Sequence, residues 1–129
     1  MDFGGNGSTR ARMSRADAII FGCGAGGLNC LLTYGRRYRV TAFVDNNPNV
    51  KFRIPLRIEI VHPSALAPEQ IEGVTFIISS METFSIIDQL VRLSRGANFN
   101  LEFPEPAVIY SPLGRLLAPY IIRRYGHQG

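Results

Sequence analysis

Apolar residues in this chain fall into short, nearly continuous runs, separated by longer segments in which they recur at helical spacing. Such runs are typical of strands in a parallel sheet that is buried on both faces. The predicted strands occupy residues 16–21, 38–44, 57–61, 74–78 and 98–103, and the predicted helices occupy residues 25–34, 65–71 and 83–95. This alternation predicts an α/β fold, a three-layer Rossmann-like domain with a mostly parallel sheet of about five strands and right-handed crossovers.

The predicted helices carry broad apolar faces. In the first helix, Leu28, Leu31 and Leu32 form the expected buried side, and Gly35 follows where a left-handed residue is favoured. Pro68 interrupts the second helix. The third helix has two adjacent apolar stripes, which together predict one wide buried face. The stripes are Ile86, Leu90 and Leu93, and Phe84, Ile87 and Val91.

Beyond residue 103 two prolines break the chain, and a C-terminal apolar helical extension is predicted over residues 112–125, kinked by Pro119. Exposed apolar surface of this extent usually marks an interface, so we predict a C2 homodimer with contacts from residues 108–125. Packing on the same domain and contact with a membrane surface are the alternatives. The apolar side chains of the extension are Leu113, Leu116, Leu117, Tyr120, Ile121 and Ile122.

A glycine-rich turn joins the first strand to the first helix, with the sequence Gly22-Cys23-Gly24-Ala25-Gly26-Gly27. It matches the Gly-x-Gly-x-x-Gly pattern of dinucleotide-binding βαβ units. Gly22 permits the tight turn, Gly24 leaves room for a pyrophosphate, and Gly27 lets the helix lie close to the strand. The helix N-terminus offers free N–H groups to an anion. The whole turn, including Cys23, Ala25 and Gly26, is therefore a predicted cofactor-binding element.

Polar residues follow the second and fourth strands. Asp45 lies 18 residues after the last glycine of the turn, near the spacing of about 20 expected for a ribose-binding carboxylate. We predict that Asp45 binds the adenosine ribose and disfavours NADP, and that Asn46 and Asn47 contact the adenine edge. Ser79 and Ser80 end the fourth strand, where α/β sheets place ligands. A purely structural Asp45, in the turn before Pro48, is the alternative.

Composition and charge narrow the class of protein to which this chain can belong. The chain has 129 residues and a net charge of +4, and 14 of its residues are Lys or Arg, with Lys51 the only lysine. A solvated arginine-rich surface is favoured over a nucleic-acid partner, because no nucleic-acid motif is present. No apolar run approaches the roughly 20 residues of a membrane span. We expect a disordered basic lead-in at 1–15 without a secretory signal, a nucleotide-binding domain at 16–103, an extension at 104–129, and a cytoplasmic location.

Residues with catalytic potential are few. Cys23 and Cys30 are seven residues apart, too far along a helix for a disulfide. Cys23 is interpreted as a small turn residue, with a reactive thiol at a helix N-terminus as the alternative. His62 and Glu82 fall near strand ends, but a surface histidine and a carboxylate that complements the helix dipole are the favoured interpretations. No metal-ligand cluster is predicted.

Residues 16–103 resemble the Rossmann-like nucleotide-binding module of bacterial polysaccharide-biosynthesis proteins. The resemblance rests on the segments Ile19 to Gly27, Tyr38 to Pro48 and Phe76 to Ser80. In that family the module precedes nucleotide-sugar dehydratase/epimerase domains, whose catalytic Tyr-x-x-x-Lys pair has no counterpart in this sequence. The resemblance therefore implies an accessory N-terminal domain without its catalytic domain, which is more consistent with a binding protein than with an enzyme.

Three functions remain. The first is a nucleotide-binding accessory or sensor module in nucleotide-sugar or polysaccharide metabolism, with NAD as its ligand and a nucleotide sugar as the alternative. The second is an interaction protein with no ligand, which dimerises or docks on a larger biosynthetic enzyme. The third is a small NAD-dependent oxidoreductase. The first is favoured, because the glycine turn and Asp45 agree in position.

Overall fold

A single sheet of five parallel strands organises the protein, in the order β3-β2-β1-β4-β5. The computed structural model describes residues 15–47, 58–113 and 116. The strands are β1 (Asp17–Phe21), β2 (Arg39–Val44), β3 (Glu59–Val61), β4 (Thr75–Ile78) and β5 (Asn100–Glu102). The predicted α/β class and the parallel sheet are confirmed, and each strand lies within the range predicted for it.

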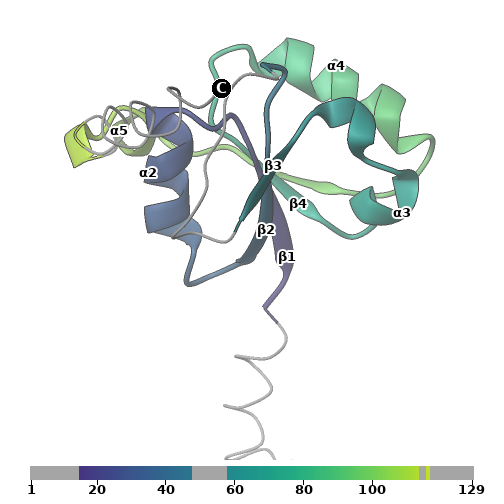
Figure 1. Cartoon of the computed structure of the whole chain (residues 1–129), viewed down its shortest axis with the longest axis horizontal. Helices are drawn as coiled ribbons and strands as arrows, with labels where there is room; N and C mark the ends of the chain where they lie inside the picture. The colour runs from purple at the N-terminus through teal and green to yellow at the C-terminus, as the bar shows by residue number, and fades with distance from the viewer. Residues whose placement is uncertain (1–14, 48–57, 114–115, 117–129) are drawn as a thin grey trace, which may run out of the picture.

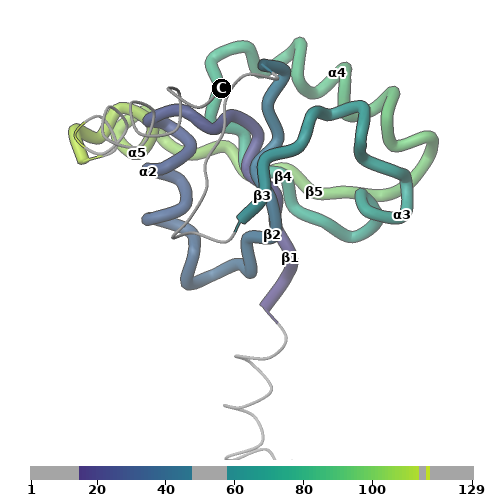
Figure 2. The backbone as a smooth tube through the Cα atoms, viewed as in Figure 1, coloured from purple at the N-terminus to yellow at the C-terminus, as the bar shows by residue number. Residues whose placement is uncertain are grey.

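Helices cover both faces of this sheet (Figure 1). On one face lie α2 (Ala25–Tyr34) and α5 (Pro106–Ile109), which contact each other. On the other lie the 3-10 turn η1 (Pro63–Ala65), α3 (Pro68–Ile71) and α4 (Thr83–Ser94). The tube in Figure 2 shows the same division, with the sheet between the two layers. The predicted three-layer arrangement is therefore confirmed.

Alternate residues of the strands enter two separate cores. Ile19 and Phe21 of β1 face the α3–α4 layer, whereas Ala18 and Ile20 face α2. All four are at most 4% exposed. The nearly continuous apolar runs in the sequence follow from this burial on both faces.

Only part of each predicted helical face is buried. Leu28 is 4% exposed, but Leu32 is 52% exposed. In α4, Ile86 and Leu90 pack on the sheet, whereas the stripe that contains Phe84 and Val91 is exposed, with Phe84 at 88%. The prediction of one wide buried face is wrong for the second stripe, because α4 lies at the surface and meets the sheet along one side.

Two local predictions are also corrected. Gly35 has a right-handed φ of −63°, and its backbone N–H donates to the Leu31 oxygen at 2.9 Å. A Cβ at this position would lie 2.6 Å from the Leu31 oxygen, so close approach rather than a left-handed backbone requires glycine. Pro68 does not interrupt a helix, because it starts α3, where a missing N–H leaves no bond unmade.

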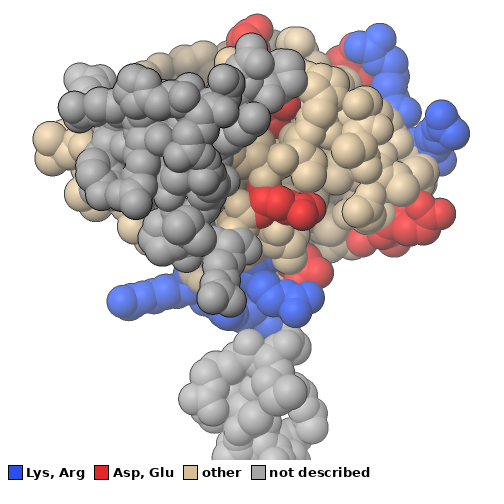
Figure 3. Space-filling model, viewed as in Figure 1, with Lys and Arg blue, Asp and Glu red and all other residues tan. Residues whose placement is uncertain are grey.

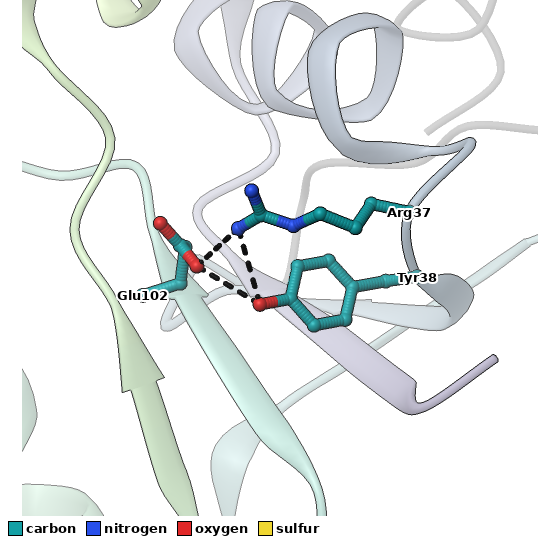
Figure 4. Close-up of polar contacts among 3 residues, drawn as sticks. All are labelled: Arg37, Tyr38 and Glu102. Carbon is teal, nitrogen blue, oxygen red and sulfur yellow. Dashed lines mark hydrogen bonds and ion pairs between the residues drawn. The ribbon is translucent and has the colours of Figure 1, made fainter.

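A polar cluster at the turn before β2 ties that turn to β5 (Figure 4). Arg37 Nη2 donates to Glu102 Oε1 at 2.6 Å, and the Tyr38 hydroxyl donates to the same oxygen at 2.9 Å. The guanidinium also lies over the rings of Tyr34 and Tyr38, 5.2 and 5.0 Å from their centroids. Burial, and then the charge of Glu102, raises the pKa of Tyr34. The cluster fixes the position of the turn, although exposed ion pairs add little stability.

The first helix after β5 begins earlier in the chain than the predicted C-terminal helix. The sequence pattern missed α5, whose four residues follow Glu105. Most of the predicted helix at 112–125 lies outside the described residues, and so do residues 1–14 of the predicted lead-in at 1–15. Four apolar side chains of the predicted extension also lie outside them: Leu117, Tyr120, Ile121 and Ile122. Leu113 and Leu116 are described, and they are 48% and 73% exposed. In the described part of the chain, no helix combines the length and apolar character that a bilayer crossing needs.

Candidate functional site

The glycine turn follows β1 at the carboxyl end of the sheet. Gly22 has φ +108°, and its N–H donates to the Val44 oxygen at 2.7 Å, which fixes the turn against β2. A Cβ on Gly22 would also collide with the Ser79 hydroxyl. Both the backbone conformation and the lack of space therefore require glycine, as predicted from the motif.

The other glycines of the turn have distinct surroundings. A Cβ on Gly27 would collide with the Gly22 carbonyl oxygen, so this glycine lets α2 lie against the turn. A Cβ on Gly24 would meet no atom within 4 Å, and one on Gly26 would lie 3.3 Å from Ile109 Cγ2. Gly24 thus faces open space, and no described side chain caps the helix N-terminus at Gly24. The first turn of α2, including Ala25, presents its N–H groups there.

Asp45 lies at the end of β2 and faces this turn. Its Oδ2 accepts hydrogen bonds from the Cys23 backbone N–H at 3.1 Å and from Cys23 Sγ at 3.3 Å. Its Oδ1 accepts the Asn47 N–H at 2.7 Å. The structure thus brings the predicted carboxylate and the glycine turn together. Asp45 also has the structural role of ordering the turn that follows β2.

The Cys23 thiol is held in its protonated form. Burial, and then the negative charge of Asp45, raises its pKa far above the ordinary value. Burial alone raises the pKa of Cys30 to about 12. Both cysteines are fully buried and unpaired. Their environments favour the small-residue interpretation over a reactive thiol, since the thiolate is the reactive species.

Ser79 has a structural role, and it also lines one of the two pockets beside the turn, so its contact with a ligand stays a prediction. Its hydroxyl contacts the Phe21 oxygen at 2.8 Å and the Gly22 oxygen at 3.1 Å, both as the donor. It is 8% exposed. A serine at the end of β4 therefore ties that strand to the turn after β1, which holds the two loops at a fixed separation.

The remaining predicted residues, Ser80, Asn46 and Asn47, follow strands β4 and β2 at the same edge of the sheet. The Ser80 hydroxyl accepts the Glu82 N–H at 3.1 Å, which orders the loop before α4. The Asn46 side-chain amide exchanges two hydrogen bonds with that of Gln89 in α4, at 3.0 and 3.3 Å. Asn47 is exposed, and its backbone N–H binds Asp45. The side chain of Asn46 is thus hydrogen-bonded to α4.

Two pockets flank the glycine turn. The first, here called the acidic pocket, has a volume of about 250 Å³, and the second, the apolar pocket, about 230 Å³. The acidic pocket is lined by Phe21, Gly22, Asp45, Asn46, Ser80, Glu82, Ser85 and Ile86. The apolar pocket is lined by Ala25, Gly26, Ser79, Met81, Ile109, Tyr110 and Ser111. Ligand pockets usually measure roughly 300–1,000 Å³, so a dinucleotide would need both.

The chain topology explains why the pockets lie here. Neighbouring strands β1 and β4 lead to helices on opposite faces of the sheet, α2 and α4 (Figure 1). Loops that diverge in this way open a crevice at the carboxyl ends of the strands, where open α/β sheets bind ligands. The two pockets occupy that crevice on either side of the turn.

The segment from α5 to Ser111 forms a wall of the apolar pocket that the sequence pattern does not predict. Asn29 of α2 is 3% exposed, and its Nδ2 donates to the oxygens of Ile109 and Ser111 at 3.0 Å each. These bonds hold the segment after α5 against the first turn of α2. A buried asparagine on an otherwise apolar helical face was the available signal.

A larger groove of about 490 Å³ lies elsewhere, over β2 and β3 and beside α3. Asp17, Glu59, Glu69 and Glu72 are among its lining residues. None of its lining residues belongs to the glycine turn, so we place the candidate site at the turn despite the larger volume of the groove. His62 is not among the lining residues of either pocket: its Nδ1 accepts the Ser64 N–H at 3.1 Å and caps η1.

Comparison with known proteins supports the fold. Neither a protein-family model nor a curated protein sequence matches this chain. The solved structure of RSP, a Rex-family repressor, matches with a TM-score of 0.51 and 16% identity over 98% of this chain and 66% of that chain. RSP in complex with β-NADH matches with a TM-score of 0.52 and 15% identity, over 98% of this chain and 68% of that one. This chain thus spans about two thirds of the length of the structures it resembles. The likeness supports a Rossmann-like fold for this chain.

Proposed function

We propose that this protein is a nucleotide-binding module whose ligand is NAD or NADH, and that it acts as a sensor or accessory domain. The main support for this proposal is the hydrogen bond from the Cys23 N–H to Asp45, which places a carboxylate beside the open glycine turn. Pyrophosphate would lie on the first turn of α2, and Asp45 would accept hydrogen bonds from the ribose. The likeness to a structure that holds β-NADH supports this choice of ligand.

The charges near the site support a ribose rather than a phosphate in the acidic pocket. Asp45 and Glu82 both line this pocket, and no arginine or lysine is among the described residues that line either pocket. The described basic residues around β2, such as Arg36 and Arg39, precede that strand or begin it. Figure 3 shows basic side chains at the lower edge and at the upper right of the described surface. Backbone N–H groups of α2 would therefore hold the pyrophosphate.

We also propose the metabolic context in which the module acts. A role in nucleotide-sugar or polysaccharide metabolism rests on the resemblance of residues 16–103 alone. A nucleotide sugar would place its pyrophosphate on the same turn, so it is the second ligand to test. A protein with the same fold and no ligand would instead use the exposed apolar side chains, such as Phe84 and Leu116, for docking.

Thermal melting with several ligands tests the function directly. NADH and NAD should raise the melting temperature at millimolar concentration, and NADP should raise it much less. A ligand at 100 times its Kd stabilises a protein by about 2.7 kcal/mol. CoA and UDP-glucose serve as comparison ligands. A shift with UDP-glucose alone would replace NAD with a nucleotide sugar, and no shift with any ligand would support the docking protein.

We predict that Gly24→Val weakens NADH binding by at least about tenfold, or about 1.4 kcal/mol. The substitution should leave the fold intact, because Gly24 has φ −86° and its Cβ would enter open space. The valine would instead occupy the place of the pyrophosphate. Calorimetry measures the affinity, and circular dichroism checks the fold. Unchanged affinity in the folded variant would remove the turn from the site.

We also propose a homodimer that uses residues 108–125. Among the described apolar residues of this range, Leu113 is 48% and Leu116 is 73% exposed. Leu116→Glu should dissociate the dimer, because burial of an unpaired charge is costly. Light scattering at tens of micromolar gives the mass, with Leu32→Glu, at an exposed position on α2, as the control. A monomeric unmutated chain would contradict the proposal.

A further inference from the structure

The apolar pocket differs chemically from the acidic pocket on the other side of the turn. No carboxylate and no basic side chain is among its described lining residues. Its walls come from Met81, after β4, and from Ile109 and Tyr110, at the end of α5. Its floor is the first turn of α2, at Gly26. The pocket therefore suits an uncharged group with apolar faces.

The wall from α5 is fixed in place by contacts within the domain. Asn29 holds the Ile109 and Ser111 oxygens at 3.0 Å each, on either side of Tyr110. Ile109 Cγ2 lies so close to Gly26 that a Cβ there would be 3.3 Å away. Val108 packs against the buried core under α2. Tyr110, by contrast, is 53% exposed, so its side chain is not part of that core.

We propose that the apolar pocket is a second subsite, which takes a flat, uncharged ring carried by the second half of the dinucleotide. Tyr110 and Met81 contact the ring, and Asn29 positions the segment that carries Tyr110. The inference rests on the proposed function. It adds a ligand-contacting role for the chain beyond β5, which a glycine-turn motif does not contain.

The volumes of the two pockets and the chemistry of their walls both point to a ligand with two different halves. Neither pocket alone reaches the usual volume of a ligand site, and the glycine turn separates them. A ligand whose pyrophosphate lies over Gly24 has one half in each pocket. The half beside Asp45 is bound by polar groups. The other half meets a thioether and an aromatic ring, which favour flat apolar faces.

A comparison of NADH with ADP-ribose tests the subsite. ADP-ribose has the adenosine, the pyrophosphate and the second ribose, but lacks the nicotinamide ring. Calorimetry on the unmutated chain should give tighter binding of NADH. Tyr110→Ala should weaken NADH binding about three- to tenfold, the scale of an aromatic contact, and leave ADP-ribose binding unchanged. Tyr110→Phe should keep the NADH affinity.

A matched control and a second variant complete the test. Phe103 is 50% exposed, similar to Tyr110, and is not among the lining residues of the pocket, so Phe103→Ala should change neither affinity. Asn29→Asp removes the amide donor that holds α5 and should lower the NADH affinity relative to ADP-ribose.

The outcomes separate the two proposals. Equal affinities for NADH and ADP-ribose, with no effect of Tyr110→Ala, would overturn the subsite and leave the nucleotide site standing. An equal loss of both ligands in Tyr110→Ala would assign Tyr110 to the whole site and also overturn the ring subsite. Failure of both ligands to bind the unmutated chain would overturn the proposed function and the subsite together.

Discussion

Gly27→Ala is expected to destabilise the protein by about 2–3 kcal/mol, the upper part of the range for overpacked sites. The new Cβ would collide with the Gly22 carbonyl oxygen and lie 3.4 Å from Phe43 Cε1. The Gly22 oxygen is fixed, because it also accepts the Ser79 hydroxyl at 3.1 Å. The backbone of the turn must therefore move away from α2.

The sign of this effect is informative. Alanine in the interior of a helix is normally about 1 kcal/mol more favourable than glycine, so the substitution would stabilise α2 if space were available. Chemical denaturation measures the change in the free energy of unfolding, with Gly24→Ala as the matched control, since its Cβ meets no atom within 4 Å. Equal stability of the two variants would show that Gly27 does not set the distance between helix and turn.

The second large effect is expected for Asp45. Asp45→Ala should weaken NADH binding by about 1–3 kcal/mol, the scale of hydrogen bonds to a charged group. It should also lower the melting temperature, because the Cys23 N–H and the Asn47 N–H lose their acceptor. Asp45→Asn keeps an acceptor oxygen while it removes the charge, so it separates the ionic contribution from the structural one.

Selectivity against NADP provides the matching test. A 2′-phosphate on the ribose would lie near Asp45 and Glu82, which both line the acidic pocket. The unmutated protein should therefore bind NADH more tightly than NADPH, and Asp45→Asn should reduce that difference. Glu69→Ala, at an exposed position in the separate groove, is the control. Similar affinities of the unmutated chain for NADH and NADPH would contradict the ribose-binding role.

The residues of the site fall into a structural part and a ligand-binding part. Gly22, Gly27 and Ser79 form the structural part, because each is held by close contacts inside the protein. Gly24 and Asp45 border the space that a ligand would occupy. We therefore expect Gly27→Ala to act mainly on stability and Gly24→Val mainly on affinity, although both lie in the same motif.

The sequence by itself determined the parts of this protein that depend on local geometry. The spacing of Gly22, Gly24 and Gly27 predicts the turn, because each position has a backbone or steric requirement that can be read from a few neighbouring residues. The apolar runs predict the strands, since a parallel sheet buries both faces of each strand. The place of Asp45 follows from the length of one βαβ unit, which brings the end of β2 beside the turn.

Only the tertiary structure decided which side chains meet across long separations. Ser79 is bound to Phe21, 58 residues away, so its hydroxyl is used inside the protein. Asn29 holds Ile109, 80 residues away, and thereby builds the apolar pocket from a segment with no recognisable motif. The exposure of Phe84 also follows from packing. Periodicity shows that a helix has apolar stripes, but the position of the helix on the sheet decides which of them is buried.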